Sequence, residues 1–179
     1  IWPNIDLALD WMDRYGDRDG DGFIEYARLS AKGLIQQGWK DSWDSVSHED
    51  GALAAPPIAL CEVQGYSYAA KCAGATIALA LGQVEKSQTL LIQAEKLKNN
   101  FHKRFWSEEL STYVLALDGQ KRQCRVKASN AGHCLYTGIV DKRYARTMAH
   151  TLMTPNSFSG WGVRTLASSE ARFKPMAYH

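Results

Sequence analysis

The sequence of 179 residues predicts an all-α fold with short β-strands in its loops, in which buried helices alternate with amphipathic helices. Residues 58–81 are apolar on almost every side of a helix, whereas residues 83–105 show one apolar stripe. The same two patterns recur at 129–140 and 141–153. A ring of inner helices surrounded by outer helices needs this alternation, so we expect an α/α toroid. A simple bundle usually has amphipathic helices throughout.

The N-terminal third of the chain is expected to contain one helix and two loops. Residues 3–15 show a helical pattern that starts with a proline and is followed by a glycine, as is common at helix ends. Residues 16–38 are rich in glycine and aspartate and predict a loop with a short strand at 23–26. Residues 39–57 have no clear period and predict a long functional loop.

The remaining elements are expected to be four helices and one short strand. The first outer helix should bury a single apolar stripe. This stripe consists of Leu90, Ala94, Leu97 and Phe101. A strand is expected at 113–117. Ser129 or Asn130 is expected to cap the second inner helix, and Asp141 the last outer helix.

The overall composition is that of an ordinary soluble globular protein, with a net charge of +2 and 22% charged residues. This balance argues against nucleic acid or a membrane surface as the main partner. The four cysteines form no CxxC pair, so we expect free thiols in a reducing compartment and a cytoplasmic location. The most apolar run, residues 72–81, is too short to span a membrane. We expect no cofactor.

The most informative segment runs from Gly38 to Ser45, where two tryptophans alternate with two aspartates. Sugar rings have apolar faces that stack on indole rings and hydroxyl groups that bind carboxylates. Cleavage of a glycosidic bond also requires a carboxylic acid beside the scissile oxygen. The combination predicts a saccharide site in this loop.

Five segments, in order along the chain, resemble the amylo-α-1,6-glucosidase (glycogen debranching enzyme) family. They are 19–26 (DGDGFIEY), 33–42 (GLIQQGWKDS), 62–66 (EVQGY), 129–133 (SNAGH) and 159–166 (SGWGVRTL). The resemblance implies an (α/α)6 barrel that hydrolyses α-glucosidic bonds of glycogen and other α-glucans, with inversion at the anomeric carbon. Residues 1–179 would then be part of a single catalytic domain. Related barrel families share parts of the pattern, namely processing α-glucosidases, trehalases, and glucosylglycerate or mannosylglycerate hydrolases.

By the family pattern, the chain carries only part of the barrel and stops before the second catalytic glutamate. We therefore expect the general base to lie outside this chain. A partial barrel would expose an apolar flank, so we also expect self-association or contact with the missing half. Two alternatives remain open: a toroid that binds α-glucan without cleaving it, and a related hydrolase of another small α-glycoside. An interaction scaffold of helical hairpins would not explain the tryptophan-rich loop.

Asp41 is the residue to which the resemblance assigns the role of general acid. An inverting enzyme holds its acid and base about 6.5–9.5 Å apart, with water beside the base. The indoles of Trp39 and Trp43 could raise the pKa of Asp41, whereas Lys40 would oppose this by turning inward. The alternative is that Asp41 caps a turn or pairs with Lys40. Asp44 is the second choice for the acid, and is otherwise a ligand of sugar hydroxyls.

Further substrate-binding residues are expected on both inner helices and in a late loop. Indole stacking is assigned to Trp39, Trp43 and Trp161. Binding of hydroxyls is assigned to Glu62, Gln64, Tyr66, His133 and Arg164. The simpler explanations are that Glu62 complements a helix dipole, that His133 is a core residue and that Arg164 holds a carboxylate. Trp11 and Trp106 are expected to be packing residues.

The segment 17–22 copies the start of an EF-hand calcium loop, with Asp17, Asp19 and Asp21 at ligand positions. The twelfth position of such a loop is Arg28, where calcium needs a bidentate glutamate. We therefore expect an aspartate–glycine turn whose side chains bond the backbone, and no metal.

Overall fold

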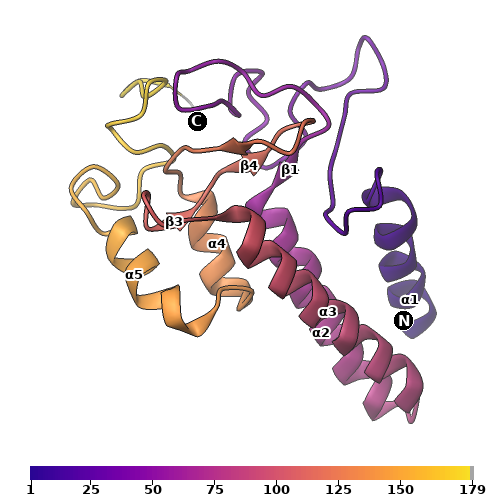
Figure 1. Cartoon of the computed structure of the whole chain (residues 1–179). Coiled ribbons are helices and arrows are strands. Elements are labelled where there is room, and N and C mark those ends of the chain that lie inside the picture. Colours follow the sequence, from indigo (N-terminus) through magenta and orange to yellow (C-terminus); the bar gives the residue numbers. More distant parts are fainter. Residues whose placement is uncertain (178–179) are drawn as a thin grey trace.

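Two long helices form the centre of the molecule (Figure 1). The computed structural model describes residues 1–177. Helices α2 (Cys61–Ala80) and α3 (Val84–Phe105) form a hairpin, and helix α1 (Trp2–Trp11) packs beside α2. A π-helical turn, η1 (Met12–Gly16), continues α1, so the helix predicted at the N-terminus is confirmed.

Two shorter helices follow in the second half of the chain. Helix α4 (Asn130–Thr137) packs against α2, and helix α5 (Lys142–Leu152) comes directly after it. Asp141 caps α5 as predicted, because its side chain accepts a hydrogen bond from the backbone N–H of Arg143. Gly138 ends α4 with a left-handed conformation, φ 77°, which shortens this helix relative to its predicted range.

Short strands connect the helices. One antiparallel sheet has the order β1 (Ala59–Leu60), β4 (Ala116–Leu117) and β5 (Gln123–Cys124), and a second pairs β2 (Trp106–Ser107) with β3 (Thr112–Tyr113). Leu60 pairs with Ala116 immediately before α2 begins. This pairing fixes the start of α2 in the fold.

The predicted helices with short strands between them are therefore confirmed in part, whereas the partial α/α barrel stays a prediction. The elements of residues 1–177 include two small sheets, and their helices do not close into a ring (Figure 1). The strand expected at 113–117 is split, because the N–H of Val114 bonds Phe105 whereas the N–H of Leu115 bonds Cys124 in the other sheet. The strand expected at 23–26 is reduced to one bridge, between Tyr26 and Ile58.

The predicted stripe of α3 is confirmed, since all four of its residues are buried. The prediction that the first inner helix is buried on every side is wrong. Helix α2 buries Glu62, Gln64 and Lys71, yet it exposes Tyr66 and Ile77. The reason is that α1, α3 and α4 cover only part of its circumference within the described residues.

Aromatic rings fill the core beneath the sheets. The ring of Phe101 lies 4.7 Å from that of Phe105 and 4.6 Å from that of Tyr113, measured between centroids. Trp106 packs edge-on against Tyr113 at 5.3 Å, as expected of a packing residue. Trp11 does not join the core, because its side chain is exposed beside Tyr15.

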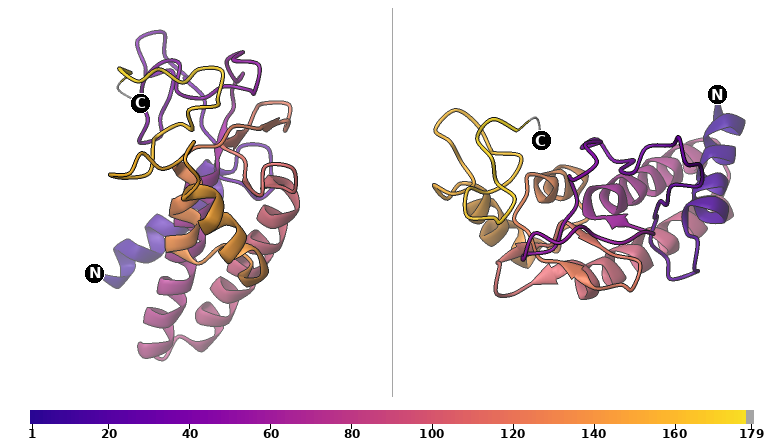
Figure 2. Two further views of the ribbon diagram at one scale, coloured as in Figure 1. Left: turned by 90° about the vertical axis from the view of Figure 1, so that its left-hand side faces the viewer. Right: turned by 90° about the horizontal axis from the view of Figure 1, so that it is seen from above.

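Two loops that are distant in sequence meet at the end of the molecule opposite the tip of the α2–α3 hairpin (Figure 2). The guanidinium of Arg172 donates to the carboxylate of Asp44 at 2.7 Å and to the carbonyl of Gly51 at 3.1 Å. The predicted long loop at 39–57 is confirmed, with one bridge between Ser47 and Leu53. The first loop contacts α4 through the rings of Trp39 and His133, and the second approaches the start of α4 through the hydrogen bond from the N–H of Ser129 to the carbonyl of Thr165.

Gly65 allows α2 and α4 to approach closely. A Cβ atom at this position would lie 2.6 Å from the Thr137 hydroxyl oxygen. We expect Gly65→Ala to lower the free energy of unfolding by about 1–3 kcal/mol through overpacking. Gly132→Ala is a matched control on α4, because its Cβ would lie an ordinary 3.5 Å from Leu152. Urea unfolding should show no decrease in the free energy of unfolding for the control. An equal decrease in both variants would contradict this explanation.

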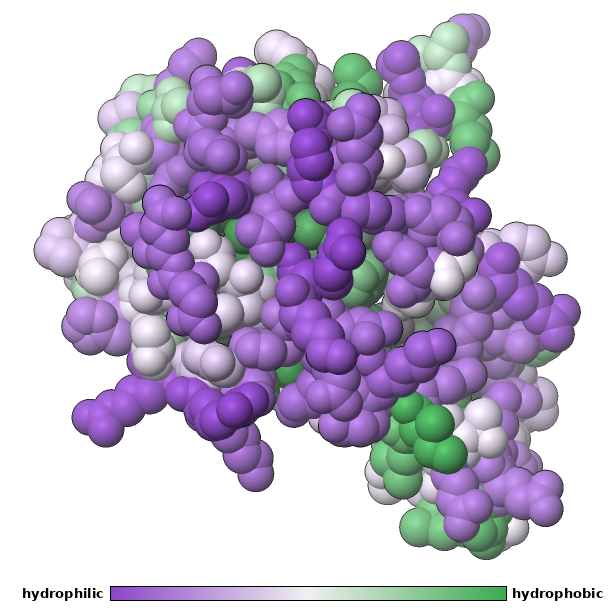
Figure 3. Space-filling model, in the orientation of Figure 1, coloured by the Kyte–Doolittle hydropathy of each residue, from purple (hydrophilic) through white to green (hydrophobic). Residues whose placement is uncertain are grey.

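Apolar residues gather at the tip of the hairpin, at the lower right of Figure 3. Leu79, Leu81 and Val84 are 58%, 54% and 50% exposed there. Exposed apolar patches usually mark contact surfaces, so we expect the 179-residue chain to self-associate. Light scattering should give a mass above that of the monomer, and Leu79→Ser with Leu81→Ser should reduce it. A monodisperse monomer of the unchanged chain would contradict the expectation.

No helix among the described residues is long and apolar enough to cross a membrane. The four cysteines are unpaired in the structure, and Cys61, Cys124 and Cys134 are buried.

Candidate functional site

The candidate site is built on the first turns of α2 and α4, which lie side by side. Glu62 and Tyr66 are one helical turn apart on α2, and Asn130 and His133 are one turn apart on α4. The amide nitrogen of Asn130 donates to the carboxylate of Glu62 at 2.8 Å. The hydroxyl of Tyr66 and Nδ1 of His133 share a hydrogen bond of 2.7 Å. Two polar pairs therefore tie the two helix starts together.

Glu62 is the buried carboxylate of this group, with 1% of its surface exposed. Burial raises the pKa of its carboxyl, while hydrogen bonds from its own backbone and Asn130, and the nearby Lys40, oppose that rise. A buried carboxylate is costly unless it is paired. The position at the first turn of α2 reduces this cost through the helix dipole, so the simpler explanation given from the sequence fits Glu62, and its binding of sugar hydroxyls stays a prediction.

A cluster of aromatic rings lies beside the two polar pairs. The ring of Trp39 lies 6.0 Å from that of His133, and the ring of Tyr66 meets His133 edge-on at 5.8 Å, between centroids. Burial, together with Lys40, lowers the pKa of His133, so its imidazole is neutral at neutral pH. Trp39 and Tyr66 remain 45% and 42% exposed. This group thus combines accessible ring faces with a neutral imidazole.

Lys40 turns inward beneath the tryptophan-rich loop. Its ammonium donates to the carbonyl of Thr165 at 2.5 Å and lies 5.2 Å from the ring centroid of Trp39. Burial lowers the pKa of Lys40 to about 8, although the carboxylate of Glu62 favours its charged form. Lys40 therefore connects residues 39–45 with the late loop, which follows α5 and contains Thr165.

Asp41, the predicted general acid, is exposed, and within the described residues it forms no ion pair. The expected enclosure of Asp41 by two indoles is wrong. Trp39 faces His133, and Trp43 is 61% exposed with the guanidinium of Arg172 over its ring at 6.0 Å. The carboxyl group of Asp41 is thus open to an incoming ligand.

Asp44 and Gln64 are held by other parts of the chain. Asp44 pairs with Arg172 at 2.7 Å. The amide of Gln64 accepts from the backbone N–H of Ile24 at 2.8 Å and donates to its carbonyl at 2.7 Å, and also donates to the carbonyl of Leu60. Because Gln64 is fully buried, it braces the N-terminal loop and offers no atom to a ligand at the surface.

The late loop separates Trp161 from the rest of the predicted site. Trp161 is 99% exposed at the tip of a turn that Gly160 enters with φ 94°. The guanidinium of Arg164 lies 5.7 Å from the ring centroid of Phe173, and no carboxylate is recorded beside it in the described residues. The structure therefore brings together Trp39, Glu62, Tyr66 and His133, and leaves Trp161 apart.

Sequence reasoning missed three residues that shape this site. The only role assigned to Asn130 was that of a possible helix cap, although its place in the SNAGH segment, three residues before His133, was a usable signal. Thr165 contributes a backbone carbonyl, which no sequence pattern reveals. Arg172 lies outside every segment that carried the resemblance.

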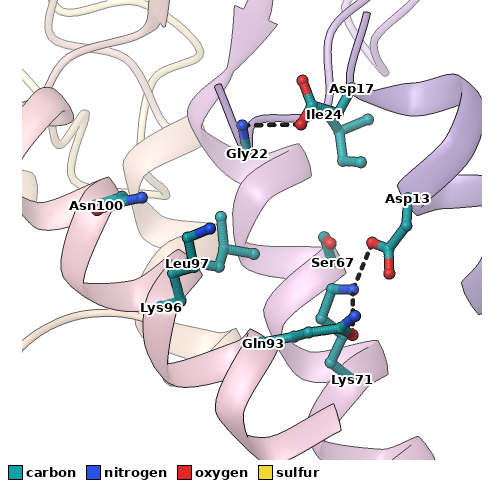
Figure 4. Close-up of a pocket in the computed structure, with 10 residues that line it drawn as sticks. All are labelled: Asp13, Asp17, Gly22, Ile24, Ser67, Lys71, Gln93, Lys96, Leu97 and Asn100. Atoms are coloured by element: carbon teal, nitrogen blue, oxygen red, sulfur yellow. Dashed lines mark hydrogen bonds and ion pairs between the residues drawn. The ribbon is translucent and has the colours of Figure 1, made fainter. Parts of the chain in front are cut away.

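A separate cavity of about 210 Å³ lies between η1, α2 and α3 (Figure 4). The ammonium of Lys71 crosses it to reach Asp13 at 2.5 Å and Gln93 at 3.1 Å. Asp17 stands at its rim. Among the described residues, only Asp17, Asp19 and Asp21 group as ligands for a metal, with oxygens within 4.8 Å of one another.

Comparisons with known proteins give a consistent class. The model of the family described as "Mannosylglycerate hydrolase MGH1-like glycoside hydrolase domain" matches residues 3–179. A GH78 family rhamnosidase of Bacillus sp. GL1 is similar in structure, with 17% identity, a TM-score of 0.63, and 87% of this chain covered. A structure described as a sialidase has 15% identity, a TM-score of 0.72, and 98% of this chain covered. No curated protein sequence matches.

The chain spans 15% of the length of each of these two structures, so the likeness concerns part of a larger protein in both cases. Fold and family together define a glycoside hydrolase-like domain. The chain belongs to the MGH1-like glycoside hydrolase domain family.

Proposed function

We propose that the chain contributes the acid-bearing half of an inverting glycoside hydrolase site that acts on α-glucosidic bonds, of the amylo-1,6-glucosidase type. The observation that carries this proposal is the cluster of Trp39, Tyr66 and His133, together with the exposed carboxylate of Asp41 two residues after Trp39 in the same loop. Asp41 protonates the leaving oxygen, and the indole of Trp39 stacks on a sugar ring.

The general base is proposed to lie outside these residues. Inversion needs a second carboxylate free to activate water. Asp44 is paired with Arg172, and Glu62 is buried against Asn130, so both nearby carboxylates have structural partners. Their proposed role is to hold the loop and the helix starts in place. The chain alone is then a sugar-binding half-site.

The proposal predicts that Trp39→Ala weakens binding of a branched α-glucan oligosaccharide about tenfold, because one stacking face of about 1–1.5 kcal/mol is lost. Isothermal titration calorimetry of the 179-residue chain measures this. Trp11→Ala is the matched control, since Trp11 is also an exposed indole but lies on α1. Equal affinities of both variants, or the larger loss at Trp11, would contradict the proposal.

A second candidate substrate is a small glycoside with an acidic aglycone. The family description names mannosylglycerate hydrolase, and three cations, Lys40, Arg172 and Lys174, line a small cavity beside Ser42 and Asp44. A carboxylate of the aglycone would complement these cations. Binding of mannosylglycerate in preference to the neutral glucan, with loss in Arg172→Gln, would favour this substrate.

A further inference from the structure

Three carboxylates of the N-terminal loop converge on one ammonium group, and a fourth, that of Asp17, lies beside two of them. The Nζ atom of Lys121 lies 2.9 Å from Asp19, 2.8 Å from Asp21 and 2.6 Å from Glu25. Oxygens of Asp17, Asp19 and Asp21 lie within 4.8 Å of one another. An ammonium group has three N–H donors, so these contacts use all of its hydrogen-bonding capacity.

The loop is shaped so that its carboxylates turn inward. The two oxygens of Asp17 accept from the backbone N–H groups of Gly20 and Gly22, each at 2.8 Å (Figure 4 shows the second). Gly20 and Gly22 have φ angles of 79° and 92°, which glycine adopts without strain.

A second observation comes from Glu25, whose side chain has 0% of its surface exposed. Its Oε2 atom binds Lys121, but its buried Oε1 atom has no hydrogen-bond partner in the described chain. Leaving a buried carboxylate oxygen unmatched costs free energy, and burial raises the pKa of this carboxyl. The group therefore contains more negative charge and more acceptor atoms than one ammonium satisfies.

We propose that Asp17, Asp19, Asp21 and Glu25 form a divalent-cation site whose resident cation is the ammonium of Lys121, so that the site opens to calcium when this ammonium is removed. Calcium binds six to eight oxygen ligands, mainly carboxylates and carbonyls, which this group supplies. Glu25 stands at the ninth position of the EF-hand-like loop and provides the buried carboxylate that Arg28, at the twelfth position, cannot.

The ammonium of Lys121 also connects residues 17–25 with the tryptophan-rich loop. Lys121 lies in the turn between β4 and β5, and it holds Glu25 next to Tyr26. The hydroxyl of Tyr26 donates to Gln36 at 2.5 Å, and Gln36 donates to the carbonyl of Trp43 at 3.4 Å. These contacts connect the segment that Lys121 holds with Trp43 of the tryptophan-rich loop.

The test compares the unchanged 179-residue chain with Lys121→Met by calorimetric titration with calcium chloride and by thermal unfolding in EDTA or calcium. We expect the unchanged chain to give no saturable heat and the same melting temperature in both solutions. The variant should melt lower in EDTA, bind calcium at least about tenfold more tightly, and regain roughly 5 °C or more with calcium.

Two controls make the result specific. Lys121→Met combined with Asp19→Asn should lose the calcium response, and Lys32→Met, at an exposed lysine, should behave as the unchanged chain. If Lys121→Met does not fold in EDTA, the proposal requires that calcium restores its folding. Calcium binding of equal strength to the unchanged chain, or no calcium response of the variant, would overturn the proposal.

Discussion

Asp41→Asn is expected to lower the turnover number for an α-1,6-linked glucoside about 10²–10⁴-fold in the protein that carries the complete site. The physical reason is that the leaving sugar oxygen needs a proton in the transition state, and an amide cannot supply it. Substrate affinity should change little, because Asp41 is exposed and contributes no structural ion pair within the described residues.

The nature of the leaving group makes this test specific. A glucosyl fluoride needs little protonation to depart, so Asp41→Asn should reduce its hydrolysis far less. Asp44→Asn is the control, since it breaks the pair with Arg172 without removing the proposed acid. If the loss at Asp41 is equal for both substrates, or if Asp44→Asn shows the dependence on leaving group, the assignment of the acid is wrong.

Lys40 should make the stability of the domain rise with pH in the alkaline range. Its pKa is about 8 in the folded chain and 10.5 ordinarily, because burial disfavours its charged form. Between these values the unfolded chain binds more protons than the folded chain, so raising the pH favours folding. Below pH 8 Lys40 is charged in both states, and burying its charge lowers the free energy of unfolding by the full amount of about 3 kcal/mol.

Urea unfolding from pH 7 to pH 10 measures this effect. From pH 7 to pH 10, the free energy of unfolding of the unchanged chain should rise by about 2–3 kcal/mol relative to that of Lys40→Met. Lys98→Met is a matched control, because Lys98 also donates to a backbone carbonyl, that of Gly138, and lies over a ring, that of Tyr68. Lys98 is not buried, so its variant should keep the pH dependence of the unchanged chain. Parallel profiles for Lys40→Met and the unchanged chain would contradict the burial of a charged Lys40.

The sequence predicted best what depends on neighbours within one helix. The stripe of α3 and the cap at Asp141 follow from periodicity and from a side chain that reaches a backbone N–H two residues away. Helix α2 was misjudged, because its polar buried residues are satisfied by distant groups. Gln64 reaches Ile24, forty residues away in sequence.

The candidate site shows the same limit more clearly. The tryptophan–aspartate loop, the helix periodicity and the family resemblance together pointed to Trp39, Glu62, Tyr66 and His133, which the structure gathers at the two helix starts. The contacts that shape the site join residues 67 to 128 positions apart, such as Tyr66 with His133 and Asp44 with Arg172. Local patterns carry no information about such pairs.

The most direct test of the account is the nuclear magnetic resonance spectrum of the ¹⁵N-labelled chain, whose six tryptophans give six indole N–H signals. Titration with a branched α-glucan oligosaccharide should shift the signals of Trp39 and Trp43, and leave those of Trp11 and Trp106 unchanged. No shift at saturating sugar, or a shift confined to Trp11 or Trp106, would contradict a saccharide site at the starts of α2 and α4.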